Sequence, residues 1–310
     1  MSIANVPSAR PERDLAGARA RFASLAARDD ESIAQTGRSR LFANDERARR
    51  AVVLLHGFTN CPQQWVPFAE MLAARGSAVV IPRFPGHGAR DRRGLALATI
   101  EPSDLLATAN EAVDIAAGLG DRIVVCGLSI GSAVGSWLSF ARDDIARNVA
   151  LVPFFGLHGF PHAADRLAAR VLVTLPNRFV PWDPRGDGGQ VPPYAYPRFA
   201  TRALGAMLEI GLDAVARAHS QSCSGETVVC LNAREPAIDN GLARVFAQRI
   251  ERVRAGSTRV IAWTDLPANH DLIDPTNALA RVDLVYPRVL AEIERESAAY
   301  LRGVRSILRD

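Results

Sequence analysis

The most informative chemistry in this sequence is a serine placed between two glycines. The string GLSIG (127–131) follows a predicted strand at 122–127 and precedes a stretch rich in small residues. A strand that turns this sharply into a helix leaves the central side chain exposed at the helix N-terminus, and bulky neighbours two positions away would not fit. The helix dipole and its free N–H groups favour negative charge there. We therefore predict that Ser129 is a nucleophile; the alternative is a glycine-rich turn with a capping serine.

A nucleophilic serine needs a base, and the candidates are histidines at positions 56, 87, 158, 162, 219 and 270. If the order along the chain is serine, acid, base, the first two are excluded. His158 and His162 fall in an irregular segment, and His219 ends a predicted helix before any further strand. His270 lies in a loop just after the predicted strand at 258–263, and such loops are where an open α/β sheet binds its ligands. We predict that His270 is the base.

Two carboxylates compete to orient this histidine. Both follow the predicted strand at 226–232: Glu235 lies three residues past it, and Asp239 directly precedes a predicted helix. An N-cap position explains Asp239 without catalysis, so Glu235 is favoured and Asp239 stays an alternative. Asp265 and Asp271 are less favoured, because they lie on the histidine loop rather than after the preceding strand.

A tetrahedral oxyanion needs two backbone N–H donors. One is expected from Ile130, the residue after the nucleophile. The other is expected from the loop that follows the first buried strand, where Gly57 lets the backbone approach closely and the N–H of Phe58 is the candidate. His56 is expected to hold this loop by hydrogen bonding rather than to act as a base.

The elements that must position these residues are visible as a regular alternation. Predicted strands are short apolar runs at 51–55, 77–82, 122–127, 148–155, 226–232 and 258–263. Predicted helices lie between and after them, at 63–75, 102–117, 130–141, 201–219, 240–253 and 283–303. Continuous apolar runs alternating with helices are typical of buried parallel strands in βαβ units, so we predict an α/β fold. A helix from Pro11 to about Arg28 and a short strand near 39–43 are expected at its edge.

The alternation is interrupted at 154–200, a segment rich in proline, glycine and aromatic residues. It divides the chain into an N-terminal arm with the first edge strand (1–50), a core (51–153 and 201–310) and an insertion that we expect to form a small cap. The candidates to line an acyl pocket are Phe154, Phe155, Phe160, Leu172, Phe179 and Trp182. Most aromatic residues of the insertion are expected to form the cap's own core instead.

Composition excludes several kinds of chemistry. The chain has 310 residues and a net charge of +4, and its 37 Lys+Arg residues are all arginine. Without lysine there can be no Schiff base, pyridoxal-phosphate attachment, P-loop lysine or Ser–Lys dyad. The arginines are scattered and aromatic residues amount to 6%, so no nucleic-acid partner is expected.

The four cysteines and the apolar stretches add further expectations. No cysteine pair has CxxC spacing, which argues against a zinc or dithiol redox site, and no metal or cofactor is expected. The N-terminus does not have the pattern of a secretory signal, and no apolar run is long enough to span a bilayer. We therefore expect a cytoplasmic protein without a stable membrane anchor.

Several motifs together resemble the α/β-hydrolase superfamily, in particular its bacterial carboxylesterases and monoacylglycerol lipases. They are LLHGFT (54–59), PGHG (85–88), GLSIG (127–131), REPAID (234–239) and HDLIDP (270–275). The resemblance covers residues 51–300 and implies a mostly parallel sheet of eight strands flanked by helices. Related enzymes usually carry Asp where this chain has Glu235, which keeps Asp239 in contention.

The resemblance also implies hydrolysis of carboxylic esters. Ser129 would be the nucleophile, His270 the base and Glu235 the acid, with Phe58 and Ile130 as oxyanion donors. We expect a serine hydrolase that cleaves small-molecule esters through an acyl-enzyme. The same residues would serve a thioesterase, an amidase, a C–C hydrolase or an acyltransferase. From a different class, the alternative is a non-catalytic small-ligand-binding protein on this fold.

Overall fold

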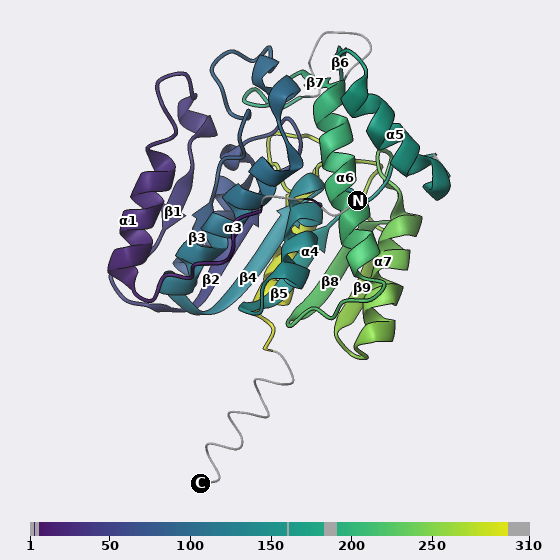
Figure 1. Cartoon of the computed structure of the whole chain (residues 1–310). Coiled ribbons are helices and arrows are strands. Elements are labelled where there is room, and N and C mark those ends of the chain that lie inside the picture. Colours follow the sequence, from purple (N-terminus) through teal and green to yellow (C-terminus); the bar gives the residue numbers. More distant parts are fainter. Residues whose placement is uncertain (1–2, 4–5, 160, 183–190, 297–310) are drawn as a thin grey trace.

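Seven strands form one mostly parallel sheet in this computed structural model, which describes residues 3, 6–159, 161–182 and 191–296. Among these strands, β1 at the edge runs antiparallel to its neighbour β3, and the other neighbours pair in parallel. Figure 1 shows them side by side across the molecule. In spatial order they are β1 (Arg40–Phe42), β3 (Ala78–Ile81), β2 (Ala48–Leu55), β4 (Gly120–Leu128), β5 (Ile145–Leu151), β8 (Glu226–Asn232) and β9 (Thr258–Trp263).

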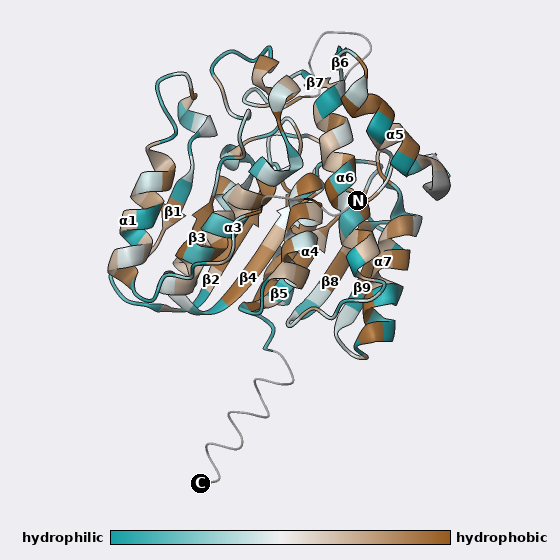
Figure 2. Ribbon diagram, in the orientation of Figure 1, coloured by the Kyte–Doolittle hydropathy of each residue, from teal (hydrophilic) through white to brown (hydrophobic). Residues whose placement is uncertain are grey.

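The central strands are continuously apolar because helices cover both faces of the sheet. Residues 52–55, 79–81 and 124–126 are fully buried. Figure 2 shows this apolar centre in brown, while hydrophilic residues occur on the surrounding helices. Burial on both faces leaves no polar face to alternate with, which is why these strands appear in the sequence as unbroken apolar runs. The predicted α/β fold is confirmed.

Helices α1, α3, α4 and α6 contact one another in that order on the side of the sheet that faces the viewer in Figure 1. Helices α2 and α8 meet through Phe68 and Tyr286, whose ring centroids are 5.0 Å apart. None of the described helices is both long and apolar enough to cross a membrane. The helices are α1 (Leu15–Ala26), α2 (Val66–Ala74), α3 (Pro102–Leu119), α4 (Ile130–Ala141), α5 (His162–Thr174), α6 (Thr201–Arg217), α7 (Asn240–Val253) and α8 (Val282–Glu294), with short 3-10 helices η1 (Gln35–Gly37), η2 (Pro62–Trp65) and η3 (Leu95–Thr99).

The main sheet has seven strands in the described residues, so the expectation of eight is wrong there. The short strand expected near 39–43 is β1, and the described residues ahead of it form α1 and η1 rather than a further strand. Helix α1 is capped by Asp14, which accepts a hydrogen bond from the N–H of Gly17 (2.8 Å). It packs on α3, where Arg21 pairs with Asp114 (2.8 Å). The part of the arm ahead of β1 therefore covers a helix instead of extending the sheet.

The described residues between Pro153 and α6 lie outside the main sheet, beyond the carboxyl ends of its strands. They include α5, which packs on α6, and an antiparallel pair of β6 (Phe179–Pro181) and β7 (Arg198–Ala200). Figure 1 shows these elements at the top of the molecule. Tyr196 anchors them: its N–H donates to the carbonyl of Thr59 (2.8 Å), and its hydroxyl donates to the carbonyl of Gly86 (3.0 Å). The segment is thus fastened to loops that follow β2 and β3.

Candidate active site

Ser129 occupies the single position between the end of β4 and the start of α4. Its backbone has φ 57° and ψ −114°, a conformation that residues other than glycine rarely adopt. Three backbone hydrogen bonds hold it there. The N–H of Ser129 donates to the carbonyl of Leu151 (3.0 Å), and the Ser129 carbonyl accepts from the N–H groups of Ala133 and Phe154 (both 3.1 Å). The surrounding strand and helix therefore fix where the serine side chain points.

The two flanking glycines are required by close backbone approach. A Cβ at Gly127 would lie 2.3 Å from the carbonyl carbon of Gly131, and a Cβ at Gly131 would lie 2.1 Å from the carbonyl oxygen of Leu55. Either substitution would force the backbone apart, because real Cβ atoms do not come this near to main-chain atoms. The glycines predicted from the sequence to make room for the turn are therefore placed as the steric argument requires.

His270 pairs with Glu235 across two loops that follow neighbouring strands. The Nδ1 of His270 lies 2.9 Å from Oε1 of Glu235, whose side chain is fully buried. The same carboxylate oxygen accepts a hydrogen bond from the N–H of Ala237 (2.8 Å). Because an ionised carboxylate can only accept, Nδ1 carries the hydrogen and Nε2 of the neutral ring is left as an acceptor. This is the tautomer that a base acting on serine needs.

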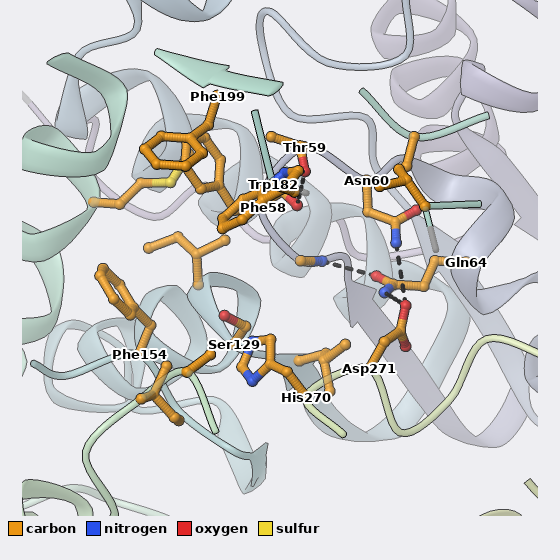
Figure 3. Close-up of a pocket in the computed structure, with 18 of the residues that line it drawn as sticks. Phe58, Thr59, Asn60, Gln64, Ser129, Phe154, Trp182, Phe199, His270 and Asp271 are labelled. Carbon is orange, nitrogen blue, oxygen red and sulfur yellow. Dashed lines mark hydrogen bonds between the residues drawn. The ribbon is translucent and has the colours of Figure 1, made fainter. Parts of the chain in front are cut away.

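The charges around His270 shift its affinity for a proton. Burial opposes a positive charge on the ring, but the hydrogen bond to Glu235, the charge of Glu235 and the charge of Asp271 outweigh it and raise the pKa of His270 above its ordinary value. An imidazolium formed during a reaction would therefore be stabilised in this position. Ser129 and His270 line the same pocket, and Figure 3 shows the two side chains next to each other.

Asp239, the alternative acid, has a different position. It is the N-cap of α7, and its Oδ1 accepts hydrogen bonds from the N–H groups of Gly241 (2.6 Å) and Leu242 (3.3 Å). A side chain that closes the first turn of a helix in this way has a sufficient structural reason to be aspartate. Of the two carboxylates, Glu235 is the one that contacts His270.

The loop after β2 is held in place by a buried histidine. His56 is fully buried, accepts a hydrogen bond at Nε2 from the N–H of Phe84 (3.1 Å) and contacts the carbonyl of Gly57 through Nδ1 (3.0 Å). Burial, with the neighbouring His87, lowers the pKa of His56 well below its usual value, so the ring stays neutral. Thr59 has a positive φ of 59°. Phe58 and Ile130 line the same pocket as Ser129.

The pocket is a cavity of about 450 Å³ with two chemically different sides. One side is apolar and aromatic, and its members come from the loop after β2, the segment beyond β5 and helix α6: Phe58, Phe154, Leu157, Trp182, Phe199, Leu204 and Met207. The other is polar, with Asn60, Gln64, Asn269, Asp271 and Asn277. Figure 3 shows Ser129 and His270 between them.

The predicted acyl-pocket residues have mixed positions. Trp182 lines the pocket, where its ring packs against those of Phe58 and Phe199 (centroids 5.7 and 4.5 Å away). Phe155 does not line it: its side chain is fully buried against Phe246 of α7, with centroids 4.5 Å apart. Strand β5 ends at Leu151, earlier than predicted, and the turn that follows sends Phe154 rather than Phe155 into the pocket. Phe160 lies outside the described residues.

Sequence reasoning missed most of the polar side of the pocket. Gln64 hydrogen-bonds Gly57 in the loop after β2, which we call the oxyanion loop, and Asp271 in the loop that carries His270, the histidine loop. In the sequence, Asp271 is only a less favoured candidate for the acid. The sequence offered no clear signal, because Gln64 follows a second glutamine, Gln63, and only the structure shows which of the two is buried and needs partners. On the apolar side, Met207 and Leu204 of α6 gave no signal beyond ordinary helix periodicity.

A family model described as the alpha/beta hydrolase family matches residues 52–274, most of the chain. Comparison with curated protein sequences yields no match.

Similar solved structures include one of the metagenome-derived lipolytic enzymes LipS and LipT, at 19% identity, covering 85% of this chain and 100% of that chain with a TM-score of 0.65. A soluble variant of monoglyceride lipase from Saccharomyces cerevisiae is 12% identical, with 83% and 91% covered and a TM-score of 0.64. The monoacylglycerol lipase of Paleococcus ferrophilus is 15% identical, with 82% and 97% covered and a TM-score of 0.63. At these identities the structures establish similarity of fold alone. On the extent of the family match, the chain belongs to the alpha/beta hydrolase family.

Proposed function

We propose that the protein is a serine hydrolase that cleaves carboxylic esters of small molecules through an acyl-enzyme on Ser129. The observation that carries this proposal is the His270–Glu235 pair (2.9 Å) in the same pocket as a serine held at positive φ between strand and helix. Nucleophile, base and orienting acid with these local environments are what acyl transfer requires. The lipolytic enzymes among the similar structures support an ester as the substrate.

The proposed reaction has two halves. Nε2 of His270 takes the proton from Oγ of Ser129 as the oxygen attacks the ester carbonyl carbon, and the N–H groups of Phe58 and Ile130 hold the oxyanion. The intermediate collapses, the C–O bond to the alcohol breaks, and His270 returns the proton to the leaving oxygen. Water then attacks the acyl-enzyme with the same base and releases the acid and the serine. Glu235 keeps the ring in the correct tautomer throughout.

The apolar side of the pocket is proposed to receive the acyl group. Leu157, Trp182 and Phe199 on that side belong to the segment 154–200, which we propose forms a cap over a core of residues 51–153 and 201–310, with residues 1–50 as an N-terminal arm. A cavity of about 450 Å³ has room for a medium-sized ester but not for a macromolecule. The proposed activity is therefore that of a carboxylesterase or lipase-like enzyme.

The proposal is tested with p-nitrophenyl esters of graded acyl length. Ser129→Ala is expected to lower kcat/KM by about 10⁴-fold or more, because the nucleophile is removed while binding remains. Ser139→Ala on the same helix, whose hydroxyl only bonds the carbonyl of Ser136 (2.7 Å), is the matched control and should retain activity. Turnover by Ser129→Ala at the wild-type rate would refute the proposal. Matched thioester and amide substrates separate an esterase from a thioesterase or an amidase.

A further inference from the structure

We propose that Gln64 and Asp271 form a positioning bridge that holds the oxyanion loop and the histidine loop in register for catalysis. This inference rests on the proposed function, because it assigns a role to two residues that do not themselves take part in bond making. Gln64 lies in η2, just after the loop that carries Phe58, and Asp271 directly follows His270. Figure 3 shows the two side chains joined at the polar side of the pocket.

The bridge consists of two hydrogen bonds made by one buried amide. Oε1 of Gln64 accepts from the N–H of Gly57 (2.9 Å), and Nε2 donates to Oδ2 of Asp271 (2.9 Å). Gly57 is the residue immediately before Phe58, whose N–H is the proposed oxyanion donor. The orientation of the amide is determined by its partners, because a backbone N–H needs an acceptor and a carboxylate needs a donor. One side chain thereby connects loops that are more than two hundred positions apart in sequence.

Asp271 is held from both sides and is not available as an acid or base. Its Oδ2 also faces Nδ2 of Asn60 (3.4 Å), and its Oδ1 accepts from the N–H groups of Ile273 (3.3 Å) and Asp274 (3.2 Å). Donors thus surround both oxygens: two side-chain amides at Oδ2 and two backbone N–H groups at Oδ1. A carboxylate that is so engaged acts through position and charge rather than by exchanging a proton with substrate.

The charge of Asp271 affects the pKa of His270, and this effect can be measured in a pH profile. Burial and the neighbouring Asp274 raise the pKa of Asp271 to about 6, and the hydrogen bond from Gln64 opposes that rise. The other titratable groups near it are His270, Tyr286 and Tyr194, whose hydroxyl donates to Asp274. The negative charge of Asp271 in turn favours the protonated form of His270.

Small displacements of the Phe58 N–H, of the size that loss of the bridge would permit, are expected to lower the rate. A misplacement of about 1 Å in a reacting constellation can cost on the order of 100-fold in rate. The N–H of Phe58 can move only as far as Gly57 moves, and the side-chain partner of the Gly57 N–H is Gln64. Loss of the bridge should therefore lower kcat, while the apolar side of the pocket continues to bind the acyl group and KM changes little.

The test compares Gln64→Leu, Gln64→Glu and Asp271→Asn with Gln63→Leu, the adjacent glutamine, which does not line the pocket. For Gln64→Leu we expect kcat of the folded protein to fall by about 100-fold with KM within about threefold. The melting temperature should fall modestly, because the N–H of Gly57 and the carboxylate of Asp271 each lose a buried partner. For Asp271→Asn we expect the acid limb of kcat/KM to move to lower pH, because the charge that favours protonated His270 is gone. Combining Gln64→Leu with Asp271→Ala, which removes the acceptor altogether, should cost much less than the product of the two single effects, since both break one bridge.

Gln64→Glu supplies the conservative rescue. Above the raised pKa of the pair, two carboxylates face each other and kcat should be low. As the pH falls, the pair takes up a shared proton, which restores both an acceptor for Gly57 and a donor to Asp271. Its kcat relative to wild type should therefore rise toward low pH, and that of Gln64→Leu should not.

The bridge is refuted if kcat of Gln64→Leu stays within threefold of wild type, if its loss is accounted for by a lower melting temperature, or if Gln64→Glu shows no recovery at low pH. Should Gln64→Leu fail to fold, Gln64→Glu and Asp271→Asn decide the matter by their pH profiles. An active Ser129→Ala would instead remove the proposed function itself, so the two failures are distinguishable.

Discussion

The carboxyl ends of the strands form one rim of the central sheet (the carboxyl edge) and their amino ends form the other (the amino edge). The two rims differ in backbone strain and in buried charge. At the carboxyl edge lie the three described non-glycine residues with positive φ, namely Thr59, Ser129 and Val152, and each belongs to or adjoins the candidate site. At the amino edge the backbone is ordinary and the notable feature is buried charge. Arg147 of β5 is fully buried and pairs with Glu226 at the start of β8 (2.5 Å). Among the described residues, backbone strain outside glycine is therefore found where chemistry is proposed, whereas the fully buried Arg147 lies at the opposite edge.

The arginines at the amino edge show one reason for the use of arginine rather than lysine in this chain. The guanidinium of Arg147 bonds Glu226 and also the carbonyl oxygens of Glu292 and Arg295 at the end of α8 (both 2.5 Å). Arg142 similarly joins Asp114 of α3 (2.7 Å) and Asp144 (2.6 Å). A planar group with five donors can satisfy several acceptors at once, which a lysine ammonium does less well. At this edge, buried guanidinium groups therefore join neighbouring helices and strands.

The largest loss of activity is expected from Glu235→Gln at the carboxyl edge, where the comparison predicts an effect on kcat rather than on stability. An amide can donate to Nδ1 of His270 and so favour the wrong tautomer, which should lower kcat by about 10³ to 10⁴-fold with little loss of stability. The measurement is steady-state ester hydrolysis together with thermal unfolding. Asp239→Asn is the matched control: it keeps an N-cap for α7 and should retain most of the activity. If Asp239→Asn were the inactive variant, the acid would be misassigned.

The opposite pattern is expected from Arg147→Met at the amino edge. Removing the guanidinium leaves Glu226 largely buried with one fewer partner and should destabilise the protein by about 3 kcal/mol. Denaturant unfolding measures the loss, and kcat of the folded fraction should stay within about twofold of wild type. Arg19→Ala, which breaks the exposed pair with Asp45, is the control and should leave stability unchanged. A large fall in kcat without destabilisation would remove the distinction between the two edges.

A smaller effect concerns pH. His270 must be neutral to accept the serine proton, and its neighbours raise its pKa above the ordinary value near 6.5. Activity should therefore rise with pH through a midpoint above 6.5 and be lost as pH falls through it, because protonation removes the base. The pH profile of kcat/KM measures this midpoint in the free enzyme. A midpoint clearly below 6.5 would mean that burial, not Glu235, dominates the environment of the ring.

The sequence was sufficient where a local physical rule acts on neighbouring residues. The buried strands are unbroken apolar runs because both faces are covered, and Gly127 and Gly131 mark the turn because no Cβ fits there. Asp239 could be separated from Glu235 because a capping aspartate has a recognisable position before a helix. These inferences needed no knowledge of tertiary contacts.

The rest depended on contacts that no local pattern encodes. Phe154 and Phe155 are identical neighbours, and which of them enters the pocket depends on the backbone after Val152, whose positive φ of 38° is unexpected for a β-branched residue. The contact between Gln64 and Asp271 joins two loops that only the completed fold brings together. The number of strands was taken from the resemblance, and the arm ahead of β1 forms a helix instead.

The central claim is that the strained carboxyl edge carries one activated serine, and covalent trapping tests it most directly. The protein is treated with a fluorophosphonate, and the modified peptide is located by mass spectrometry. We predict one adduct, on Ser129, that forms much more slowly in Glu235→Gln and at normal rate in Ser139→Ala. Failure of the folded wild-type protein to react would contradict the claim and favour a small-ligand-binding protein on this fold. An adduct at another serine would contradict the assignment of Ser129 as the nucleophile.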